Sequence, residues 1–173
     1  ADVYINGSLV GCHSGGYTAF SFDITEFIHL GENEIVVAVR DESDTSYHSR
    51  GKQREKRGGI WYTSQSGIWQ TVWLESVPSD YISSLLIVPS IKNSSVSITV
   101  ISESDADAVI EFSGKSFSAT TNKVCEIPLD DFIAWTPETP QLYEFSVTLG
   151  EDNINSYFAM RSFSVEKDES GIM

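Results

Sequence analysis

Apolar and polar residues alternate along most of this sequence with a period of two, which is the pattern of β-strands that bury one face. The alternation at 3–9 predicts a hairpin, because its centre is Asn6-Gly7, a pair that readily takes the positive φ angles of a type I′ turn. A short helical turn with a side-chain cap is expected at 23–28. Further strands are predicted at 20–24, 35–39 and 68–74, the last with apolar side chains on both faces.

The second half of the chain contains seven short apolar–polar alternations separated by Asn-Ser, Ser-Asp and Gly turns. This regular succession of short strands is typical of an immunoglobulin-like sandwich. Tyr143 follows two prolines, and its hydroxyl is expected to bond a nearby backbone carbonyl, as in a tyrosine corner. The strands are predicted at 81–88, 95–101, 108–113, 115–119, 123–127, 142–149 and 155–165.

Pro78-Ser79-Asp80 indicates a boundary between two domains. Residues 1–77 hold 10 acidic and 6 basic side chains, whereas residues 78–173 hold 15 and 5, so the charge balance also changes there. After residue 166 the alternation ends, and 167–173 is interpreted as a linker. We therefore expect an all-β chain with one domain at 1–77 and a second at 78–166.

Charge and composition exclude several classes of partner. The 173 residues include 25 acidic and 11 basic side chains, a formal net charge of −14. Such a chain repels phosphates, so nucleic acid is not an expected partner. No apolar run approaches the roughly 20 residues of a membrane-spanning helix, so a membrane is not expected either.

Cysteine and histidine usage points away from metal chemistry. Cys12 and Cys125 are interpreted as free thiols in a reducing compartment, and no Cys/His cluster has the spacing of a zinc site. We expect no metal, no cofactor and a cytoplasmic location, with a secreted or periplasmic location as the alternative. The three histidines are separated in sequence and lack a nucleophile motif, so they are interpreted as structural. Asp130-Asp131 is interpreted as a solvated turn whose side chains point apart.

The stretch from Arg40 to Gly59 differs from its surroundings, because it is long, polar and almost free of aliphatic residues. Five of the eleven basic residues of the chain lie between Arg50 and Arg57. A loop of this length in a compact domain is usually functional or mobile. Trp61-Tyr62 follows it directly.

Six short motifs stand out along the chain: VYING at 3–7, GGYTAFSFDIT at 15–25, GENE at 31–34, SGIWQTVWL at 66–74, WTPETPQLY at 135–143 and YFAMRSF at 157–163. The first three resemble the sugar-binding jelly-roll domain of the family-2 glycoside hydrolases, which include β-galactosidases, β-glucuronidases and β-mannosidases. The fourth resembles the strand that closes that domain, and the last two resemble the end of the family's immunoglobulin-like domain. The motifs occur in the order of the family and span nearly the whole chain.

The resemblance implies a partial jelly roll at 1–77 followed by an immunoglobulin-like sandwich at 78–166, with 167–173 leading towards a catalytic barrel. The family hydrolyses β-glycosidic bonds with retention, using two glutamates of that barrel. The chain is therefore expected to be a non-catalytic portion of a β-glycosidase that supports the barrel. The alternative is a stand-alone carbohydrate-binding or adhesion module made of tandem sandwiches.

The resemblance, together with the polar stretch from Arg40 to Gly59 and the aromatic pair that follows it, gives four candidate substrate-binding residues, namely Arg50, Gln53, Trp61 and Tyr62. Flat aromatic faces suit the C–H faces of sugar rings. The alternatives are a solvated loop without a binding role and core packing of the two aromatic side chains. Many family members have a substrate-contacting aspartate six residues before the glycine of the 66–74 motif, where this sequence has Trp61. That contact, and the sugar specificity linked to it, does not carry over.

The first residues enter a strand-like pattern directly, and we expect the chain to be an internal fragment that lacks the first strands of its jelly roll. Unpaired sheet edges and apolar faces such as Phe20 and Phe22 would then be exposed. The fragment is therefore expected to self-associate.

Overall fold

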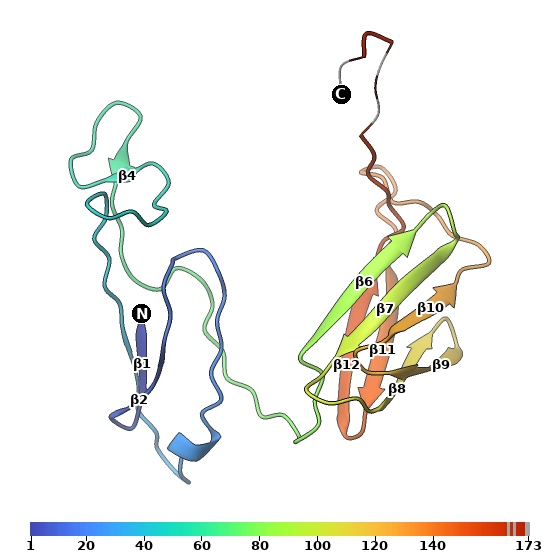
Figure 1. The fold of residues 1–173 in the computed structure, drawn as a ribbon, viewed down its shortest axis with the longest axis horizontal. Helices are drawn as coiled ribbons and strands as arrows, with labels where there is room; N and C mark the ends of the chain where they lie inside the picture. Colours follow the sequence, from blue (N-terminus) through green and yellow to red (C-terminus); the bar gives the residue numbers. More distant parts are fainter. Residues whose placement is uncertain (166, 168, 172–173) are drawn as a thin grey trace. The chain divides into compact units, whose positions relative to one another are not determined.

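The computed structural model describes residues 1–165, 167 and 169–171, and these form two compact units, Ala1–Trp73 (unit 1) and Leu74–Met173 (unit 2) (Figure 1). Each unit is described by itself. The described residues form β-strands and one 3-10 turn, so the prediction of an all-β chain is confirmed. The division falls a few residues before Pro78, and part of the predicted linker at 167–173 lies outside the described residues.

Unit 1 is built on a three-stranded antiparallel sheet in the order β2-β1-β3. The strands are β1 (Asp2–Ile5), β2 (Ser8–Cys12) and β3 (Ile35–Ala38). The predicted hairpin at 3–9 and the strand at 35–39 are thus confirmed. Asn6 and Gly7 have φ angles of 51° and 81°, the left-handed conformation that a type I′ turn requires.

Asn6 also connects the hairpin to the following segment. Its Nδ2 donates to the carbonyl oxygen of Phe27 at 2.9 Å and to Oδ1 of Asn33 at 2.8 Å, and its Oδ1 accepts from the backbone N–H of Glu34 at 2.9 Å. These bonds hold the start of β3 next to the hairpin. They matter because Ile5 is the one apolar side chain of residues 1–73, all of which are described, that lies in the buried core.

The predicted helical turn is the 3-10 turn η1 (Thr25–Phe27). The Asp23 carboxylate accepts hydrogen bonds from the backbone N–H of Thr25 at 2.8 Å and from its hydroxyl at 2.6 Å. Both bonds lower the pKa of the Asp23 carboxyl below its ordinary value, and the bond from the Thr25 hydroxyl has the larger effect. The predicted side-chain cap by Asp23 or Thr25 is wrong, because the N-cap residue is Ile24 and no side-chain cap bond is present; Asp23 instead closes a local turn with Thr25 just before η1.

Two strand predictions for unit 1 are wrong. Residues 20–24 and 68–74 are not strands, and the side chains of Trp69 and Trp73 are 65% and 71% exposed. Alternation identifies an apolar face, but a strand also needs a neighbour to pair with, and no strand of residues 1–73 lies beside 68–74. Phe22 instead packs on the backbone of Gly11, where a Cβ atom would lie only 2.3 Å from the ring.

Unit 2 is a sandwich of two antiparallel sheets, with strand orders β10-β7-β6 and β12-β11-β8-β9 (Figure 1). All seven strands that the sequence predicts in this half are present, and only the last differs clearly, because it ends at Phe158 instead of residue 165. The strands are β6 (Ser84–Ser90), β7 (Ser95–Ile101), β8 (Asp107–Phe112), β9 (Lys115–Thr120), β10 (Val124–Pro128), β11 (Tyr143–Leu149) and β12 (Asp152–Phe158).

The core of unit 2 lies between its two sheets. Alternate side chains of β7, β8, β10 and β11 point inward, so each sheet contributes one apolar face. Burial of these faces is the main stabilising term of such a sandwich. The fully or nearly fully buried members of the cluster are Val96, Ile98, Val100, Ile110, Ile127, Leu129, Phe145, Val147, Phe158 and Met160.

Tyr143, at the start of β11, makes the contacts expected of a tyrosine corner. Its hydroxyl accepts a hydrogen bond of 2.6 Å from the backbone N–H of Ile133 and lies 3.4 Å from the carbonyl oxygen of the same residue. Its ring stacks on Phe158, with 5.4 Å between the ring centroids. The predicted bond between the tyrosine hydroxyl and a backbone carbonyl is confirmed, and it fixes the long 129–142 connection to the sandwich.

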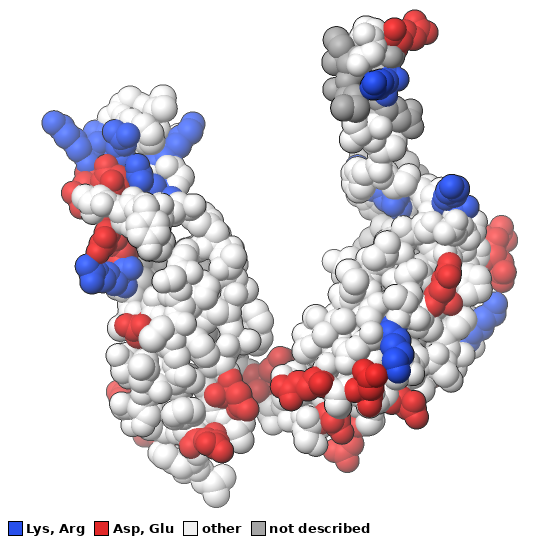
Figure 2. Space-filling view, in the orientation of Figure 1, with Lys and Arg blue, Asp and Glu red and all other residues white. Residues whose placement is uncertain are grey.

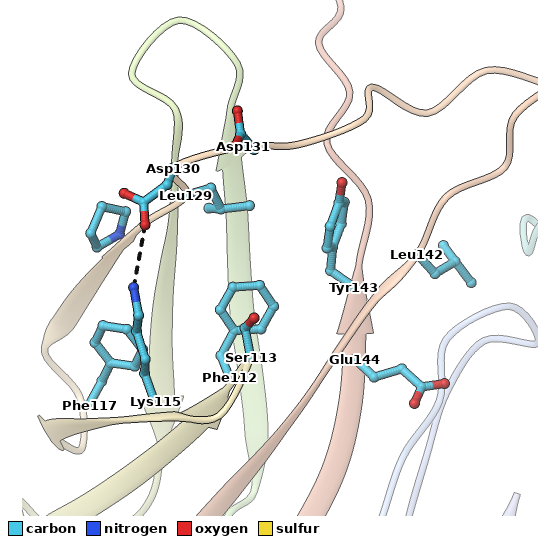
Figure 3. Close-up of a pocket in the computed structure, with 11 residues that line it drawn as sticks. Phe112, Ser113, Lys115, Phe117, Leu129, Asp130, Asp131, Leu142, Tyr143 and Glu144 are labelled. Atoms are coloured by element: carbon cyan, nitrogen blue, oxygen red, sulfur yellow. Dashed lines mark hydrogen bonds and ion pairs between the residues drawn. The ribbon is translucent and has the colours of Figure 1, made fainter.

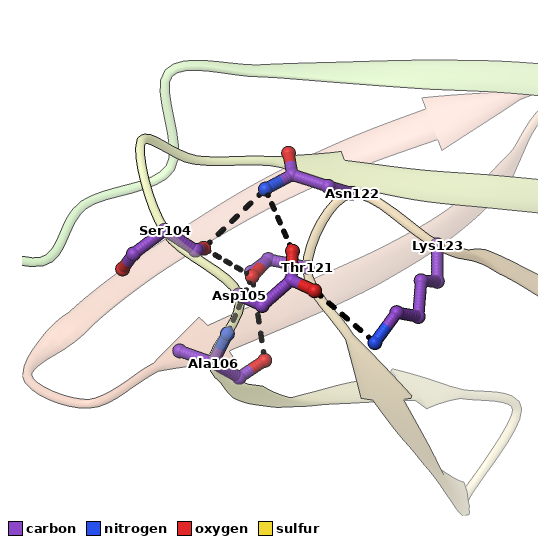
Figure 4. A network of polar contacts seen from close by, with 6 residues as sticks. All are labelled: Ser104, Asp105, Ala106, Thr121, Asn122 and Lys123. Carbon is purple, nitrogen blue, oxygen red and sulfur yellow. Dashed lines mark hydrogen bonds and ion pairs between the residues drawn. The ribbon is translucent and has the colours of Figure 1, made fainter.

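A polar network lies at the opposite turn, around the buried Thr121 (Figure 4). Its hydroxyl donates to the carbonyl oxygen of Ser104 at 2.6 Å and accepts from the backbone N–H of Ala106 at 2.7 Å. Lys123, at 3.1 Å, and Asn122 lower the pKa of the Asp105 carboxyl below its ordinary value. The network thus satisfies the backbone groups of the β7–β8 connection.

Replacing Thr121 by Val should lower the free energy of unfolding of the chain by about 1–3 kcal/mol, because it buries a methyl group in place of the hydroxyl, removes the acceptor of the partly buried Ala106 N–H and removes the short bond to the Ser104 carbonyl oxygen, while keeping the side-chain shape. Urea unfolding followed by far-UV circular dichroism measures the difference. Thr120→Val, in the last position of β9, is the matched control and should change stability by less than about 0.5 kcal/mol. Equal stability of the two variants would contradict the role given to the Thr121 hydroxyl.

Candidate functional site

Residues 40–66 form an ordered loop in unit 1, which we call the basic loop. Two short parallel strands, β4 (Gln53–Arg54) and β5 (Tyr62–Thr63), pair within it, with Gln53 opposite Tyr62. The segment between them closes on itself, because Gly58 and Trp61 exchange two backbone hydrogen bonds of 3.3 and 3.1 Å. The loop therefore places residues that are about ten positions apart side by side.

Gln53 holds three parts of the basic loop together. Its Nε2 donates to the carbonyl oxygen of Arg50 at 3.2 Å, and its Oε1 accepts from the backbone N–H of Gln65 at 2.7 Å. The backbone N–H of Tyr62 adds a bond of 2.8 Å to the carbonyl oxygen of Lys52. Both ends of the Gln53 amide are thus bonded to backbone, so its contribution to a site is to position its neighbours.

Trp61 is half-buried, and one face of its ring is covered by Arg54. The guanidinium carbon lies 3.8 Å from the ring centroid, which is the geometry of a cation–π contact. Nε of Arg54 is 3.9 Å from Oδ2 of Asp44, and Oδ1 of Asp44 accepts from the backbone N–H of Glu55 at 3.3 Å. Trp61 is therefore packed within the basic loop and is not part of the buried core.

Tyr62 and Arg50 are the candidate residues with unused binding capacity. The Tyr62 side chain is 67% exposed. The Arg50 guanidinium is half-buried and donates one weak bond of 3.4 Å to the carbonyl oxygen of Ser46, while its Nε is buried without a hydrogen-bond partner among the described residues. The Tyr62 ring is therefore the group of these two residues that lies open to a ligand, whereas the unsatisfied Nε of Arg50 lies below the surface.

The structure thus brings the four predicted site residues into one loop, with Gln53 bonded to Arg50 and opposite Tyr62. Sequence reasoning missed Arg54 and Asp44, which cover Trp61. No local motif marks the Arg54–Trp61 contact, since it depends on the tight turn at Gly58 and Gly59, both of which have positive φ angles. It also missed the bond of 2.7 Å from Nε1 of Trp69 to the carbonyl oxygen of Gly16.

All six basic side chains of residues 1–73 lie in the basic loop, and they gather on one part of the surface around β4 (Figure 2). Arg40 pairs with Glu42, and Arg54 approaches Asp44. The other four have no carboxylate within 4.0 Å among the described residues: Arg50, Lys52, Lys56 and Arg57. The basic loop is a local positive patch on an acidic chain.

Other reactive groups of the described residues do not form a second centre. Cys12 and Cys125 are free thiols, as predicted. A hydrogen bond with Asp2 raises the pKa of Cys12 above the ordinary thiol value, and burial raises the pKa of Cys125. His13 stacks on Phe20, with centroids 4.3 Å apart. Among the described residues, acidic, histidine and cysteine side chains form no group of three that could hold a metal ion. None of the helical residues described is in a segment long and apolar enough to cross a membrane.

Unit 2 has an open pocket of about 490 Å³ beside the Tyr143 corner (Figure 3). Its walls include Phe112, Phe117 and the pair formed by Nζ of Lys115 and Oδ2 of Asp130 at 3.4 Å. Asp130 points towards Lys115 and Asp131 points away from it, so the two adjacent carboxylates diverge as predicted. They do not form an acid–base pair.

Two family models match this chain in succession. The one described as glycosyl hydrolases family 2, sugar binding domain, matches residues 1–78, and the one described as glycosyl hydrolases family 2 matches residues 81–161. Both models come from the same family, and together they cover most of the sequence.

Curated relatives agree with this assignment, and solved structures share the fold of this chain. A β-galactosidase of Thermoanaerobacter pseudethanolicus is 33% identical over 173 residues, covering 88% of this chain and 22% of the relative. A putative β-glucuronidase of Formosa agariphila is 40% identical over 87 residues, covering 50% of this chain and 10% of the relative. The chain therefore spans less than a quarter of the length of these relatives.

Among solved structures, a β-glucuronidase of Faecalibacterium prausnitzii has the same fold over 96% of this chain and 33% of its own, with a TM-score of 0.68 and 22% identity. A β-glucuronidase of Dictyoglomus thermophilum gives a TM-score of 0.60 at 20% identity, covering 96% of this chain and 32% of its own. The chain belongs to glycosyl hydrolase family 2 and contains the sugar-binding domain and the immunoglobulin-like domain of that family.

Proposed function

We propose that this chain is a non-catalytic, supporting portion of a retaining β-glycosidase that hydrolyses O-glycosyl bonds. The observation that carries the proposal is that two domains of one glycosidase family follow each other within residues 1–161. Relatives at least four times as long, named β-galactosidase, support a larger enzyme around these domains. The two glutamates of the retaining mechanism are then supplied by another part of the protein.

The positions of the carboxylates in this chain support a non-catalytic role. Retaining hydrolysis needs two carboxyl groups about 5–5.5 Å apart on either side of the scissile bond. Asp130 and Asp131 border the pocket of unit 2, but they diverge, and Asp130 is paired with Lys115. Asp44 in the basic loop accepts a backbone bond and lies beside Arg54. Neither place offers a free acid facing a second free acid.

The basic loop is the part of the chain that we propose to border the sugar pocket. Gln53 fixes its shape, Trp61 stiffens it under Arg54, and Tyr62 presents an open aromatic face. The Arg50 guanidinium donates one bond among the described residues, a long contact of 3.4 Å from Nη1 to the carbonyl oxygen of Ser46, so its Nη donors can bond a sugar oxygen. Binding pockets for small molecules combine an apolar wall with a few placed polar groups in this way.

In the enzyme that contains this chain, Tyr62→Ala should lower kcat/KM for a nitrophenyl β-glycoside about threefold to tenfold, because one aromatic stacking contact contributes about 0.5–1.5 kcal/mol. Steady-state kinetics measures the ratio. The matched control is Tyr157→Ala, since Tyr157 is 61% exposed on β12 of unit 2. If the Tyr62 variant and the wild type have the same kcat/KM, the proposal that the basic loop borders the sugar pocket is wrong.

The 173-residue chain alone should not hydrolyse nitrophenyl β-galactosides, β-glucuronides or β-mannosides, because the proposal places both catalytic glutamates elsewhere. Release of nitrophenol over hours, compared with the longer enzyme as a positive control, measures this. Reproducible turnover by the isolated chain would overturn the proposal. A coding sequence without a barrel bearing two glutamates would favour the rival function, a stand-alone carbohydrate-binding or adhesion module.

We also propose that the isolated chain self-associates, because the apolar side chains of 68–74 have no strand beside them. Multi-angle light scattering should give a mass that rises with concentration, and Val72→Ser with Trp73→Ser should shift it towards the monomer. Val165→Ser, at an exposed position of unit 2, serves as the control and should leave the association unchanged. A monomer at all concentrations would contradict the proposal.

A further inference from the structure

Arg161 follows the buried Met160 of unit 2 and contacts two aromatic rings. Its guanidinium carbon is 4.6 Å from the ring centroid of Trp135 and 4.4 Å from that of Phe163. Both distances are those of cation–π contacts, in which the cation lies within about 6 Å of the ring centroid. Trp135, Arg161 and Phe163 form what we call the arginine–aromatic cluster. The cluster joins the 129–142 connection to the segment that follows β12.

Backbone contacts hold this cluster in place. Met160 is fully buried in the core of unit 2, and its carbonyl oxygen accepts a hydrogen bond of 2.9 Å from the backbone N–H of Trp135. Thr136 and Thr139 exchange two backbone hydrogen bonds of 3.1 Å and close the turn that follows Trp135. Trp135 and Arg161 are thus positioned before any partner binds, so little conformational entropy is lost on binding.

The Arg161 side chain has binding capacity that these contacts leave unused. A guanidinium can contact aromatic rings through its flat faces while its N–H donors, which lie in its plane, bond other groups. Among the described residues no carboxylate lies within 4.0 Å of the Arg161 nitrogen atoms. Arg161 is exposed, and Phe163 is 82% exposed. A charged donor group and an open aromatic ring therefore lie together on the surface of unit 2.

The chemistry of the cluster favours a protein carboxylate as its partner. Guanidinium groups bind carboxylates through two parallel N–H donors, and these charge-assisted bonds are stronger than neutral ones. Arginine and tryptophan are also enriched among the side chains that dominate protein–protein contacts. A polyanion such as nucleic acid fits less well, because it would also meet the acidic remainder of a chain whose net charge is −14.

We propose that the arginine–aromatic cluster is a docking site for a segment of the larger enzyme outside these 173 residues. An aspartate or glutamate of that segment bonds the Arg161 guanidinium, and an apolar side chain beside it packs on Phe163. Polypeptide is available for this role, because the β-galactosidase relative is at least four times as long as this chain. The inference rests on the proposed function in one respect, that a larger enzyme surrounds the chain, and it names a contact through which unit 2 supports that enzyme.

Photo-crosslinking in the larger enzyme tests the inference. The variant Phe163→benzoylphenylalanine keeps an aromatic ring in the cluster, and mass spectrometry after irradiation identifies the peptides joined to it. We expect the main crosslink to join position 163 to a segment of the same polypeptide outside residues 1–173. Tyr157→benzoylphenylalanine is the control, since Tyr157 is 61% exposed on β12, and it should not label that segment.

Charge reversal identifies the carboxylate. Arg161→Glu should lower the crosslink yield about fivefold or more, because two carboxylates in contact repel each other. Arg161→Lys keeps the charge but not the paired donors, and should lower the yield about twofold or more. In the Arg161→Glu background, changing one acidic residue of the labelled segment to arginine should restore about half of the yield or more. Lys92→Glu, in an exposed turn of unit 2, should leave the yield unchanged.

Far-UV circular dichroism checks that each variant is folded, and if Arg161→Glu is not, the yield of Arg161→Lys decides. Crosslinks confined to residues 1–173 or to a second copy of the chain would overturn the inference, as would the absence of any crosslink. A labelled segment in which no acidic residue restores the yield would overturn the carboxylate contact. The proposed function is judged separately, because the hydrolysis assays do not depend on this contact. The two ideas can therefore fail independently.

Discussion

The pairing of Gln53 with Tyr62, together with the two side-chain bonds of Gln53, gives the basic loop of unit 1 its shape. Unit 1 buries little apolar surface of its own, since Ile5 is its one core side chain among residues 1–73. Its order therefore depends on polar contacts, such as those of Asn6 and Gln53, to a degree that unit 2 does not require. Each such bond contributes only about 1 kcal/mol net, so the geometry of the basic loop rests on several of them acting together.

Unit 2 shows the contrasting case, in which sequence periodicity was enough. Its seven strands each have one inward apolar face, and both sheets are supplied by the same stretch of chain, so the pattern and the partners are found together. The corner formed by Tyr143 was also predictable, because its role depends on a local sequence, two prolines followed by a strand, and on a backbone group ten residues away. Where pattern and partner are both present, the sequence determines the structure.

Residues 20–24 and 68–74 show where that reasoning ends. Their alternation is as regular as that of the strands in unit 2, but β-structure requires hydrogen bonds to a neighbouring strand, and periodicity does not reveal whether one exists. The same distinction applies to the candidate site. The residue types of Arg50, Trp61 and Tyr62 were visible in the sequence, whereas the Arg54–Trp61 stack depends on a turn with two glycines at positive φ.

The net charge of the whole chain does not describe the charge of each part of its surface. A net charge of −14 argues against an extended polyanion, and that argument holds because a polymer interacts with the whole surface. All six basic side chains of unit 1 lie between Arg40 and Arg57, and four of them have no carboxylate within 4.0 Å among the described residues. The basic loop is therefore locally positive although the chain as a whole is acidic, so the net charge of the chain does not describe the surface that a small molecule meets at this loop.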